Sequence, residues 1–410
     1  MKNVILAVVL LFTLSASAQI IENTMKPTKF GNGILNFKGE NDSWSIKMGA
    51  RMQLLSTNNW LYDGGKVSDH VSAAMVRRYR LKFDGYVYSP KVKYKLELGL
   101  SNHDLSGFSA ATKYSPRLVL DAVVMWNFTH NWEVWFGQTK LPGNLERVIS
   151  SANLQLVDRS QLNKEFTLDR EFALQLRNHH TVGEKFVVRE KFAVSQGEGR
   201  NVTIDNVGGH HVMGRLELLP FGLFESKGDY KGGDLKREKT PKLMLASTYS
   251  YNSAARKTKG SQGVYFVDID KVINEDDTED KYYGITANVQ TLFVDMMFKY
   301  RGFSFMGEWA KRDASATVDN LVNEGSGLNL ATGYLLKSNW EIAARYTKVD
   351  VTGYKFNRSD RNQYTVGLSR YVVGHKLKVQ TDVTYEDIVE FGKIKNNNRL
   401  GFRVQVEIQL

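Results

Sequence analysis

Several features are missing from this 410-residue sequence. It contains no cysteine, so we expect neither a disulfide framework nor a lipid anchor on an N-terminal cysteine. Beyond the N-terminus, no apolar run approaches the roughly 18 to 20 residues that a membrane-spanning helix needs. The mean hydropathy of −0.36 is also too low for a bundle of such helices. Any membrane-spanning structure must therefore be built in another way.

Signals of catalysis are absent as well. The sequence has no Gly-Xaa-Ser-Xaa-Gly nucleophile motif and no glycine-rich phosphate-binding loop. The adjacent pairs His179-His180 and His210-His211 have no acid at ligand spacing, so they do not predict a metal site. We therefore expect a protein that is not an enzyme and that uses neither a metal nor a cofactor.

The N-terminus has the pattern of an export signal. Lys2 precedes an apolar stretch at residues 4–14, and Ala16-Ser17-Ala18 follows it. This order of a basic residue, an apolar stretch and small residues is typical of a secretory signal peptide. We predict that the chain is exported after cleavage behind Ala18.

The formal net charge is +11. An exported chain rarely meets nucleic acid, and the basic residues are spread over many segments instead of being clustered. We therefore expect small anions, and not nucleic acid, as the partners of this positive charge.

The last residues of the chain alternate strictly between apolar and polar side chains. Arg403, Gln405, Glu407 and Gln409 separate five apolar residues between positions 402 and 410. In an extended strand this places all apolar side chains on one face. The same pattern predicts about sixteen strands in all. They lie near residues 44–54, 76–88, 92–100, 118–128, 132–138, 170–177, 188–196, 211–220, 241–251, 288–300, 303–312, 326–336, 339–349, 362–372, 375–385 and 400–410.

The connections between these strands alternate in length. Short links are expected at 89–91, 129–131, 301–302, 337–338 and 373–374. Long ones are expected at 55–75, 101–117, 139–169, 252–287, 313–325, 351–361 and 386–399. Outer-membrane barrels sort their connections in this way, with short turns in the periplasm and long loops outside. The segment 221–240 is an exception, because it should be a short turn yet is long and mostly charged.

A sheet of this size exposed to lipid must close on itself, because open edges would leave backbone groups unpaired. About sixteen strands make a barrel wide enough for an aqueous channel. The sequence thus predicts an all-β fold, a transmembrane antiparallel β-barrel. The predicted division of the chain is a signal peptide at 1–18, a periplasmic lead-in at 19–43 and the barrel at 44–410.

Short motifs follow one another along most of the chain. They are Gly49-Ala50-Arg51-Met52-Gln53, Arg77-Arg78, Val92-Lys93-Tyr94, Gly137-Gln138, Asp158-Arg159-Ser160, Gly214-Arg215-Leu216, Pro220-Phe221-Gly222, Tyr300-Arg301-Gly302-Phe303-Ser304 with Glu308, Arg345-Tyr346 and Gly374-His375-Lys376-Leu377-Lys378. In order and spacing they resemble the phosphate-selective porins of the O and P type, which are trimeric barrels of the Gram-negative outer membrane. The resemblance implies a homotrimer, with the third long connection folded into the lumen.

In such porins a ladder of basic residues guides anions such as phosphate or polyphosphate to a narrow site. Arg51, Arg78 and Lys93 stand where the motifs place members of that ladder, and the resemblance adds Arg159 from the third long connection. The strand pattern itself makes one inner wall basic, with only Asp84 and Glu97 opposing it. The predicted pore-lining residues are Lys47, Arg51, Arg78, Arg80, Lys82, Lys93, Lys95, Arg159 and Arg215.

One arginine does not fit the inward pattern. Arg77 lies two residues before the lipid-facing Tyr79, so in a regular strand it points to the same, outward face. An arginine at the bilayer midplane would cost roughly 2 to 4 kcal/mol. We therefore expect it at the outer rim of the barrel.

Three classes of function remain open. The first is a porin that passes small anions by diffusion, in contact with outer-membrane lipid and lipopolysaccharide. The second is a general or oligosaccharide porin with no anion preference. The third is a barrel that does not transport and serves as a scaffold or an adhesin, or an outer-membrane enzyme. Because lumen charges tune selectivity without having to define it, the basic wall alone does not decide between them.

Overall fold

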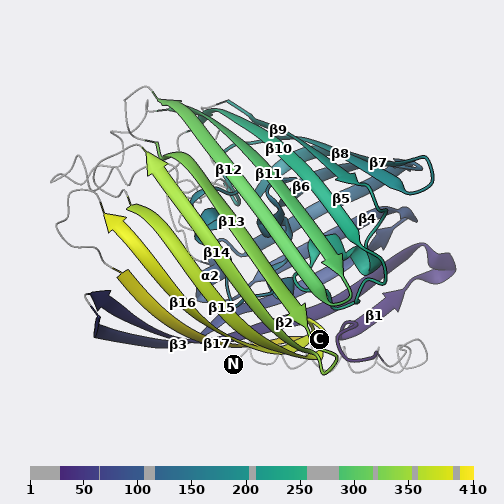
Figure 1. Ribbon diagram of the computed structural model, residues 1–410. Coiled ribbons are helices and arrows are strands. Elements are labelled where there is room, and N and C mark those ends of the chain that lie inside the picture. Colours follow the sequence, from purple (N-terminus) through teal and green to yellow (C-terminus); the bar gives the residue numbers. More distant parts are fainter. Residues whose placement is uncertain are drawn as a thin grey trace, which may run out of the picture.

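The computed structural model shows a barrel of antiparallel strands (Figure 1). It describes residues 28–63, 65–105, 116–202, 209–255, 286–316, 322–352, 359–390 and 398–410. Sixteen strands, β2 to β17, pair in sequence order, and β17 pairs with β2 to close the ring. The predicted closed antiparallel barrel is therefore confirmed. Among the described residues, no helix has the length and apolar character needed to cross a membrane.

The strands of the ring are β2 (Trp44–Asp63), β3 (Lys66–Val87), β4 (Ser89–Gly99), β5 (Val119–Thr129), β6 (Trp132–Lys140), β7 (Arg170–Val182), β8 (Phe186–Ser195), β9 (His211–Leu219), β10 (Lys242–Ala255), β11 (Ala287–Tyr300), β12 (Phe303–Ala316), β13 (Glu324–Leu335), β14 (Trp340–Thr352), β15 (Ser359–Val373), β16 (Leu377–Glu390) and β17 (Asn398–Gln409). Short turns join these strands at one end, which we call the short-turn end. The longer connections lie at the opposite, long-loop end.

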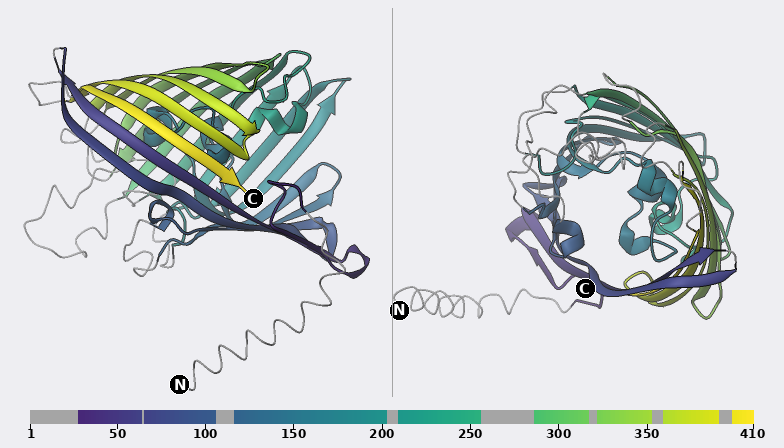
Figure 2. Two further views of the ribbon diagram at one scale, coloured as in Figure 1. Left: turned by 90° about the horizontal axis from the view of Figure 1, so that it is seen from below. Right: turned by 90° about the vertical axis from the view of Figure 1, so that its left-hand side faces the viewer.

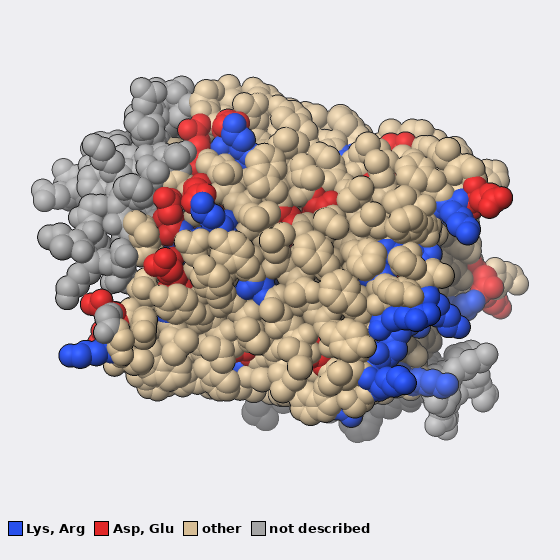
Figure 3. All heavy atoms as spheres, viewed as in Figure 1, with Lys and Arg blue, Asp and Glu red and all other residues tan. Residues whose placement is uncertain are grey.

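Alternation of side chains along the strands gives the barrel two different surfaces. Apolar residues point outward, as Trp132, Phe303 and Trp340 do beside three of the short turns. Figure 3 shows the result on one face, a broad and largely uncharged band with Lys and Arg gathered beyond one edge. Polar and charged residues of the opposite parity point inward. This is the arrangement that a lipid-exposed barrel with a watery interior needs.

A further short strand lies at the seam of the barrel. β1 (Leu35–Lys38), followed by the turn η1 (Glu40–Asp42), pairs with β2 from Leu35 opposite Met48 to Lys38 opposite Ser45. β17 pairs with β2 farther along, from residue 51 to residue 62. Since β3 occupies the other edge of β2, β1 continues the line of β17 toward the short-turn end.

The prediction of a long loop at 55–75 is wrong. β2 continues to Asp63 and β3 begins at Lys66, so the two form a long hairpin. Residues 66–76 are exposed on both faces of β3. A strand without a buried face has no apolar periodicity, so the sequence pattern does not reveal it.

The third long connection folds into the barrel, as predicted. It carries α3 (Leu145–Val148), η3 (Ser151–Asn153) and α4 (Gln161–Glu165), which lie inside the ring of strands in Figure 2. We call residues 141–169 the inner loop. Its apolar side chains pack on inward-facing residues of β7 to β14, where Leu162 and Phe166 meet Phe293 and Val349 in one buried cluster. The inner loop therefore covers that part of the lumen wall, and it also bonds to β16, where its Val157 amide donates to Asp382 and its Leu154 carbonyl accepts from Lys378. We call this side the covered half, and the side around β3 and β4 the open half.

The exceptional segment 221–240, here called the turn segment, also enters the lumen. It contains η4 (Glu225–Tyr230) and comes from the short-turn end. Lys299 Nζ donates to Lys231 O at 2.9 Å, and the amide of Gly302 donates to Asp234 Oδ2 at 2.8 Å. The acidic side chains Asp229, Asp234 and Glu238 are thus buried, whereas Lys227, Lys236 and Lys239 stay exposed.

Candidate functional site

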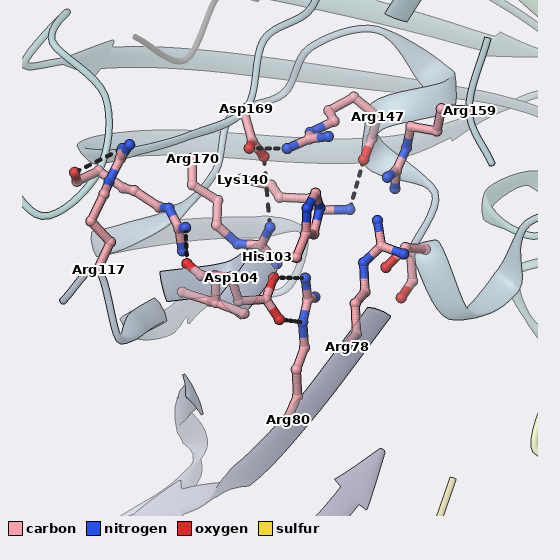
Figure 4. Close-up of a pocket in the computed structure, with 14 residues that line it drawn as sticks. Arg78, Arg80, His103, Asp104, Arg117, Lys140, Arg147, Arg159, Asp169 and Arg170 are labelled. Atoms are coloured by element: carbon pink, nitrogen blue, oxygen red, sulfur yellow. Dashed lines mark hydrogen bonds and ion pairs between the residues drawn. The ribbon is translucent and has the colours of Figure 1, made fainter. Parts of the chain in front are cut away.

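A strongly basic cavity lies between the inner loop and the open half of the wall. Its volume is about 240 Å³, and β3, β5, β6, β7 and the helix α2 (Asn102–Leu105) border it. Eight basic side chains line it, against two carboxylates (Figure 4). The basic ones are Arg78, Arg80, Arg117, Lys140, Arg147, Arg159, Arg170 and Arg200, and the acidic ones are Asp104 and Asp169.

Part of this positive charge is compensated. Arg80 binds Asp104 at 2.7 Å and Glu97 at 3.0 Å. Arg170 pairs with Asp121 at 2.9 Å, and Arg147 pairs with Asp169. These arginines are held in fixed geometry by carboxylates, so they shape the cavity more than they charge it.

Three other cations at the centre of the cavity bind only neutral oxygens. Arg78 Nη1 donates to Gln53 Oε1 at 2.7 Å. Arg159 donates to the backbone oxygens of Glu146 and Ile149, and Lys140 Nζ donates to backbone oxygens of the same loop. None of these cations has a carboxylate oxygen within 4.0 Å among the described residues. In Figure 4 the ends of Arg78, Lys140 and Arg159 point toward one another.

Two further arginines resemble these three. Arg117 donates to the carbonyl of Arg200 at 3.2 Å, and Arg200 donates to that of Asp104 at 2.6 Å. Buried guanidinium nitrogens around the cavity, including Arg78 Nε, Arg117 Nε and Arg200 Nη1, have no hydrogen-bond partner in the described part of the protein. Buried donors normally find an acceptor. The cavity therefore offers both net charge and open donors to an anion.

The pKa values of Arg159 and His103, which lie in connections beside the cavity, are both lowered. Burial, with Arg147 next in importance, lowers the pKa of Arg159 to about 9. Burial and the neighbouring Arg77 and Arg78 lower the pKa of His103 to about 4. At neutral pH the arginine is charged and the histidine is not. Burial is the larger cause of the lowered pKa in both groups, and the neighbouring arginines lower it further. A bound anion would relieve this second effect.

A second cavity opens toward the long-loop end. Its volume is about 1020 Å³, and it shares Arg78, His103, Arg147, Arg159 and Asp169 with the basic cavity. The two spaces are thus neighbours that share these residues. We call the larger one the vestibule.

The structure places the predicted pore residues in three groups. Arg78, Arg80 and Arg159 line the basic cavity. Arg51 lies beside it, paired with Glu407 at 2.8 Å and bonded to Ser151. The lysines of the same wall, Lys47, Lys82, Lys93 and Lys95, follow toward the short-turn end.

Arg215 lies elsewhere, on the half of the wall that the inner loop covers. It is buried and held by Asp295 at 2.7 Å and by Glu217 at 2.7 Å. The expectation that only two acids oppose the basic wall is also wrong. Glu407, Asp104 and Asp121 neutralise Arg51, Arg80 and Lys95, and they come from strands and loops that are distant in the sequence.

The expectation for Arg77 is wrong for a local reason. Gln53 pairs with Arg78 but the next residue, Leu54, pairs with Val76, so Arg77 is the extra residue of a β-bulge. A bulge reverses the parity of the residues on one side of it. Arg77 therefore points inward and pairs with Asp158 of the inner loop at 2.7 Å.

Five cations of the cavity are absent from the predicted pore residues, and one of them, Arg147, belongs to the inner loop. Lys140 and Arg170 are opposite each other at the ends of β6 and β7, and Arg117 and Arg200 come from connections. The signal available for the first two was their position at the strand ends that the inner loop joins. For Arg117 and Arg200 we find no signal in the sequence.

The histidine pairs do have acidic neighbours, contrary to expectation. His180 lies 3.6 Å from Glu190, and His211 lies 3.5 Å from Glu171. Within the described ranges, however, no group of three His, Asp or Glu side chains is arranged to hold a metal ion.

A family model described as phosphate-selective porin O and P matches residues 46–407. The chain belongs to this family. The match covers the whole ring of strands except its two ends, including the inner loop and the cavity. A search of curated proteins finds no match.

Solved structures of outer-membrane channels have a similar fold. An anion-selective porin from Comamonas acidovorans is 10% identical at a TM-score of 0.53, over 90% of this chain and 100% of that chain. The outer membrane channel DcaP of Acinetobacter baumannii is 13% identical at a TM-score of 0.54, over 91% and 99%. The trimer form of OmpT from Vibrio cholerae is 12% identical at 0.52, over 90% and 100%. Family and fold together identify an outer-membrane channel.

Proposed function

We propose that the protein lets small anions, such as phosphate or polyphosphate, diffuse passively through the barrel by way of the basic cavity. The observation that carries the proposal is the set of uncompensated cations at the cavity centre, Arg78, Lys140 and Arg159. Guanidinium groups can hold two oxygens of a phosphate at once, whereas an ammonium group acts as a point charge.

The arrangement of charges along the wall supports a path on both sides of the cavity. Arg399 lines the vestibule together with Arg77 and Arg403, and the latter two are paired with Asp158 and Asp382. Beyond the cavity, Lys82 lies four residues from Arg78 along β3, or roughly 13 Å at the rise of a strand. Lys47 and Lys93 continue toward the short-turn end. These three lysines have no carboxylate within 4.0 Å among the described residues, so they attract anions but hold them weakly. A channel needs sites from which the ion can leave.

The cellular setting is part of the same proposal. Residues 1–18 are removed as a signal peptide, residues 19–43 face the periplasm, and the long-loop end faces the outside, in contact with lipopolysaccharide. The barrel assembles as a homotrimer, which is supported by the trimer form of OmpT and by the family resemblance.

Reversal potentials in a planar bilayer under a KCl gradient test the proposal. The wild type should prefer chloride over potassium, and phosphate should block the chloride current. Arg78→Gln should reduce both effects, because it removes an uncompensated charge from the cavity. Lys185→Gln is the matched control, since it removes one positive charge from an exposed turn between β7 and β8.

The result also separates the alternatives. A wild type without anion preference would favour a general or oligosaccharide porin. A wild type without any conductance would favour a scaffold or adhesin. An unchanged ratio in Arg78→Gln would show that the basic cavity does not select the ion.

A further inference from the structure

The turn segment has no role in the proposed function, yet many contacts hold it inside the lumen. In addition to the bonds from Lys299 and Gly302, Arg237 Nη1 donates to the carbonyl of Leu335 at 2.8 Å. Arg189 of the wall pairs with Asp229 of the segment at 2.5 Å. A turn that only joined β9 to β10 would need none of these bonds. The segment is therefore fixed at one position in the lumen.

That position is directly against the inner loop. The amide of Gly232 donates to the carbonyl of Asn153 at 2.7 Å, and His375 Nε2 lies 3.1 Å from the carbonyl of Gly232. Phe224 packs in one buried cluster with Leu145, Ile149 and Leu154 of the inner loop. The two segments enter from opposite ends of the barrel and meet at these contacts.

The contact point is close in sequence to the basic cavity. Two residues before Asn153, Ser151 Oγ accepts a bond from Arg51 Nη2 at 2.9 Å, and both Ser150 and Ser151 line the cavity. The carbonyl of Ile149 accepts bonds from Arg159 at 2.7 Å and from Lys140 at 3.2 Å. A displacement of this part of the inner loop must therefore move the groups that orient Arg159 and Lys140.

We propose that the turn segment is the support that positions the inner loop, and through it the cations of the anion site. The inference rests on the proposed function for its effect on phosphate, but its effect on the steadiness of the current does not. The segment has no direct contact with the cavity among the described residues, so its residues act as positioning residues.

Gly232 is the position in the turn segment where an added side chain would disturb the contact with the inner loop. A Cβ atom there would lie 2.5 Å from the backbone nitrogen of Gln155 and 2.9 Å from the carbonyl oxygen of Asn153. A small cavity of about 30 Å³ lies beside Gly232, lined by the inner loop, by Gly232 and Gly233 and by the barrel wall, so little free space is left there. An alanine at 232 must therefore push the segments apart. At Gly228, in the same segment, the nearest atom to a Cβ is 3.3 Å away.

The first experiment compares Gly232→Ala with Gly228→Ala by single-channel recording in KCl, with inorganic phosphate as the blocking ion. We expect Gly232→Ala to give a noisier open-channel current and a phosphate block weakened by about tenfold, comparable to losing one charge-assisted hydrogen bond. Gly228→Ala should behave as the wild type. Gly232→Ala with wild-type noise and wild-type block, in a barrel that still shifts its gel mobility on heating, would overturn the proposal.

A second pair of variants covers the case in which Gly232→Ala does not fold. Lys299→Met removes the bonds from Lys299 Nζ to the carbonyls of Lys231 and Gly233 without adding volume. Its control is Lys242→Met, which removes an exposed bond to Phe221 at the root of the same segment. Lys299→Met should change noise and block in the direction given for Gly232→Ala, and equality with Lys242→Met would overturn the proposal.

The two proposals can fail separately. If the wild type shows no anion preference, the proposed function is wrong, whereas the comparison of current noise between Gly232→Ala and Gly228→Ala still decides the role of the turn segment.

Discussion

Particular cations on the two halves of the lumen wall differ in how their charge is balanced. On the half covered by the inner loop, the buried Arg215 is paired with Asp295 and Glu217. On the open half, Arg78 and Lys82 have no carboxylate within 4.0 Å among the described residues. A buried charge without a carboxylate partner is costly, and Arg78, which is only 5% exposed, has a neutral oxygen and the adjoining cavity in place of one. The comparison shows that Arg215 is balanced within the wall, whereas the charge of Arg78 is left available to the cavity.

The largest expected effect is a loss of stability when the ion pairs of Arg215 on the covered half are broken. Arg215→Met leaves the buried carboxylate of Asp295 without its cation, while Glu217 keeps Arg189 and Lys191, and we expect a loss of about 3 to 5 kcal/mol in the free energy of unfolding. Arg78→Gln, which removes an unpaired charge, should change it by less than about 1 kcal/mol. Thermal unfolding followed by circular dichroism in detergent measures both. Equal losses of stability in the two variants would show that Arg215 and Arg78 contribute equally to the free energy of unfolding.

The second prediction concerns salt. The Debye length falls from about 10 Å at 0.1 M to about 3 Å at 1 M, so the field of the open half should be screened. We expect the anion-to-cation permeability ratio to fall strongly over this range. Reversal potentials at a fixed concentration gradient but rising mean salt give the measurement. A ratio that does not depend on salt would place selectivity in close contacts and not in the field of the wall.

The third prediction uses His103 at the rim of the basic cavity. Because its pKa is lowered to about 4, the side chain is neutral from pH 8 to about 6 and gains a proton only as the pH falls through about 4. The anion preference should thus stay level near neutrality and rise in acid. Carboxylates also titrate there, so the control is His103→Gln, in which a smaller rise is expected. Identical profiles for both proteins would exclude the histidine as the cause.

The smallest expected effect comes from the bulge. Asp158→Asn frees Arg77 from its 2.7 Å ion pair and adds one positive charge at the vestibule. Since the pair is only partly buried, we expect a slight increase in anion preference and a stability change of less than about 1 kcal/mol. Bilayer recordings beside unfolding curves measure the two effects. A lower anion preference would mean that Arg77 acts on the solute only when Asp158 holds it.

Much of the fold was predictable because period-two alternation is a local signal. All sixteen expected strands are present, including those near 170–177 and 188–196. The hairpin at 55–75 is not visible in the sequence pattern, because residues 66–76 of its second strand have no buried face. The length and charge of the turn segment are visible in the sequence, but its position in the lumen is not, because it depends on contacts with distant strands.

The candidate site was predictable only in part. Parity along β3 placed Arg78 and Arg80 on the inner face, and the family resemblance added Arg159. The alternation along one strand does not predict which cations are paired with a carboxylate, because the partners lie on other elements. Arg80 pairs with Asp104 of the helix α2, and Arg51 pairs with Glu407 near the end of the chain. The bulge at Arg77 depends on the pairing with β2, and a single strand pattern does not contain that information.

The seam between β2 and β17 has a consequence for the order of folding. Every other neighbouring pair of ring strands is consecutive in sequence, whereas Arg51 and Glu407, which meet across the seam, are 356 positions apart. Contacts between distant residues form slowly, because the chain between them must first be brought together. We therefore expect hairpins to form early and the seam to close last. Until then the edges of β2 and β17 are free to pair with other chains. The ion pair between Arg51 and Glu407 forms only when the ring closes.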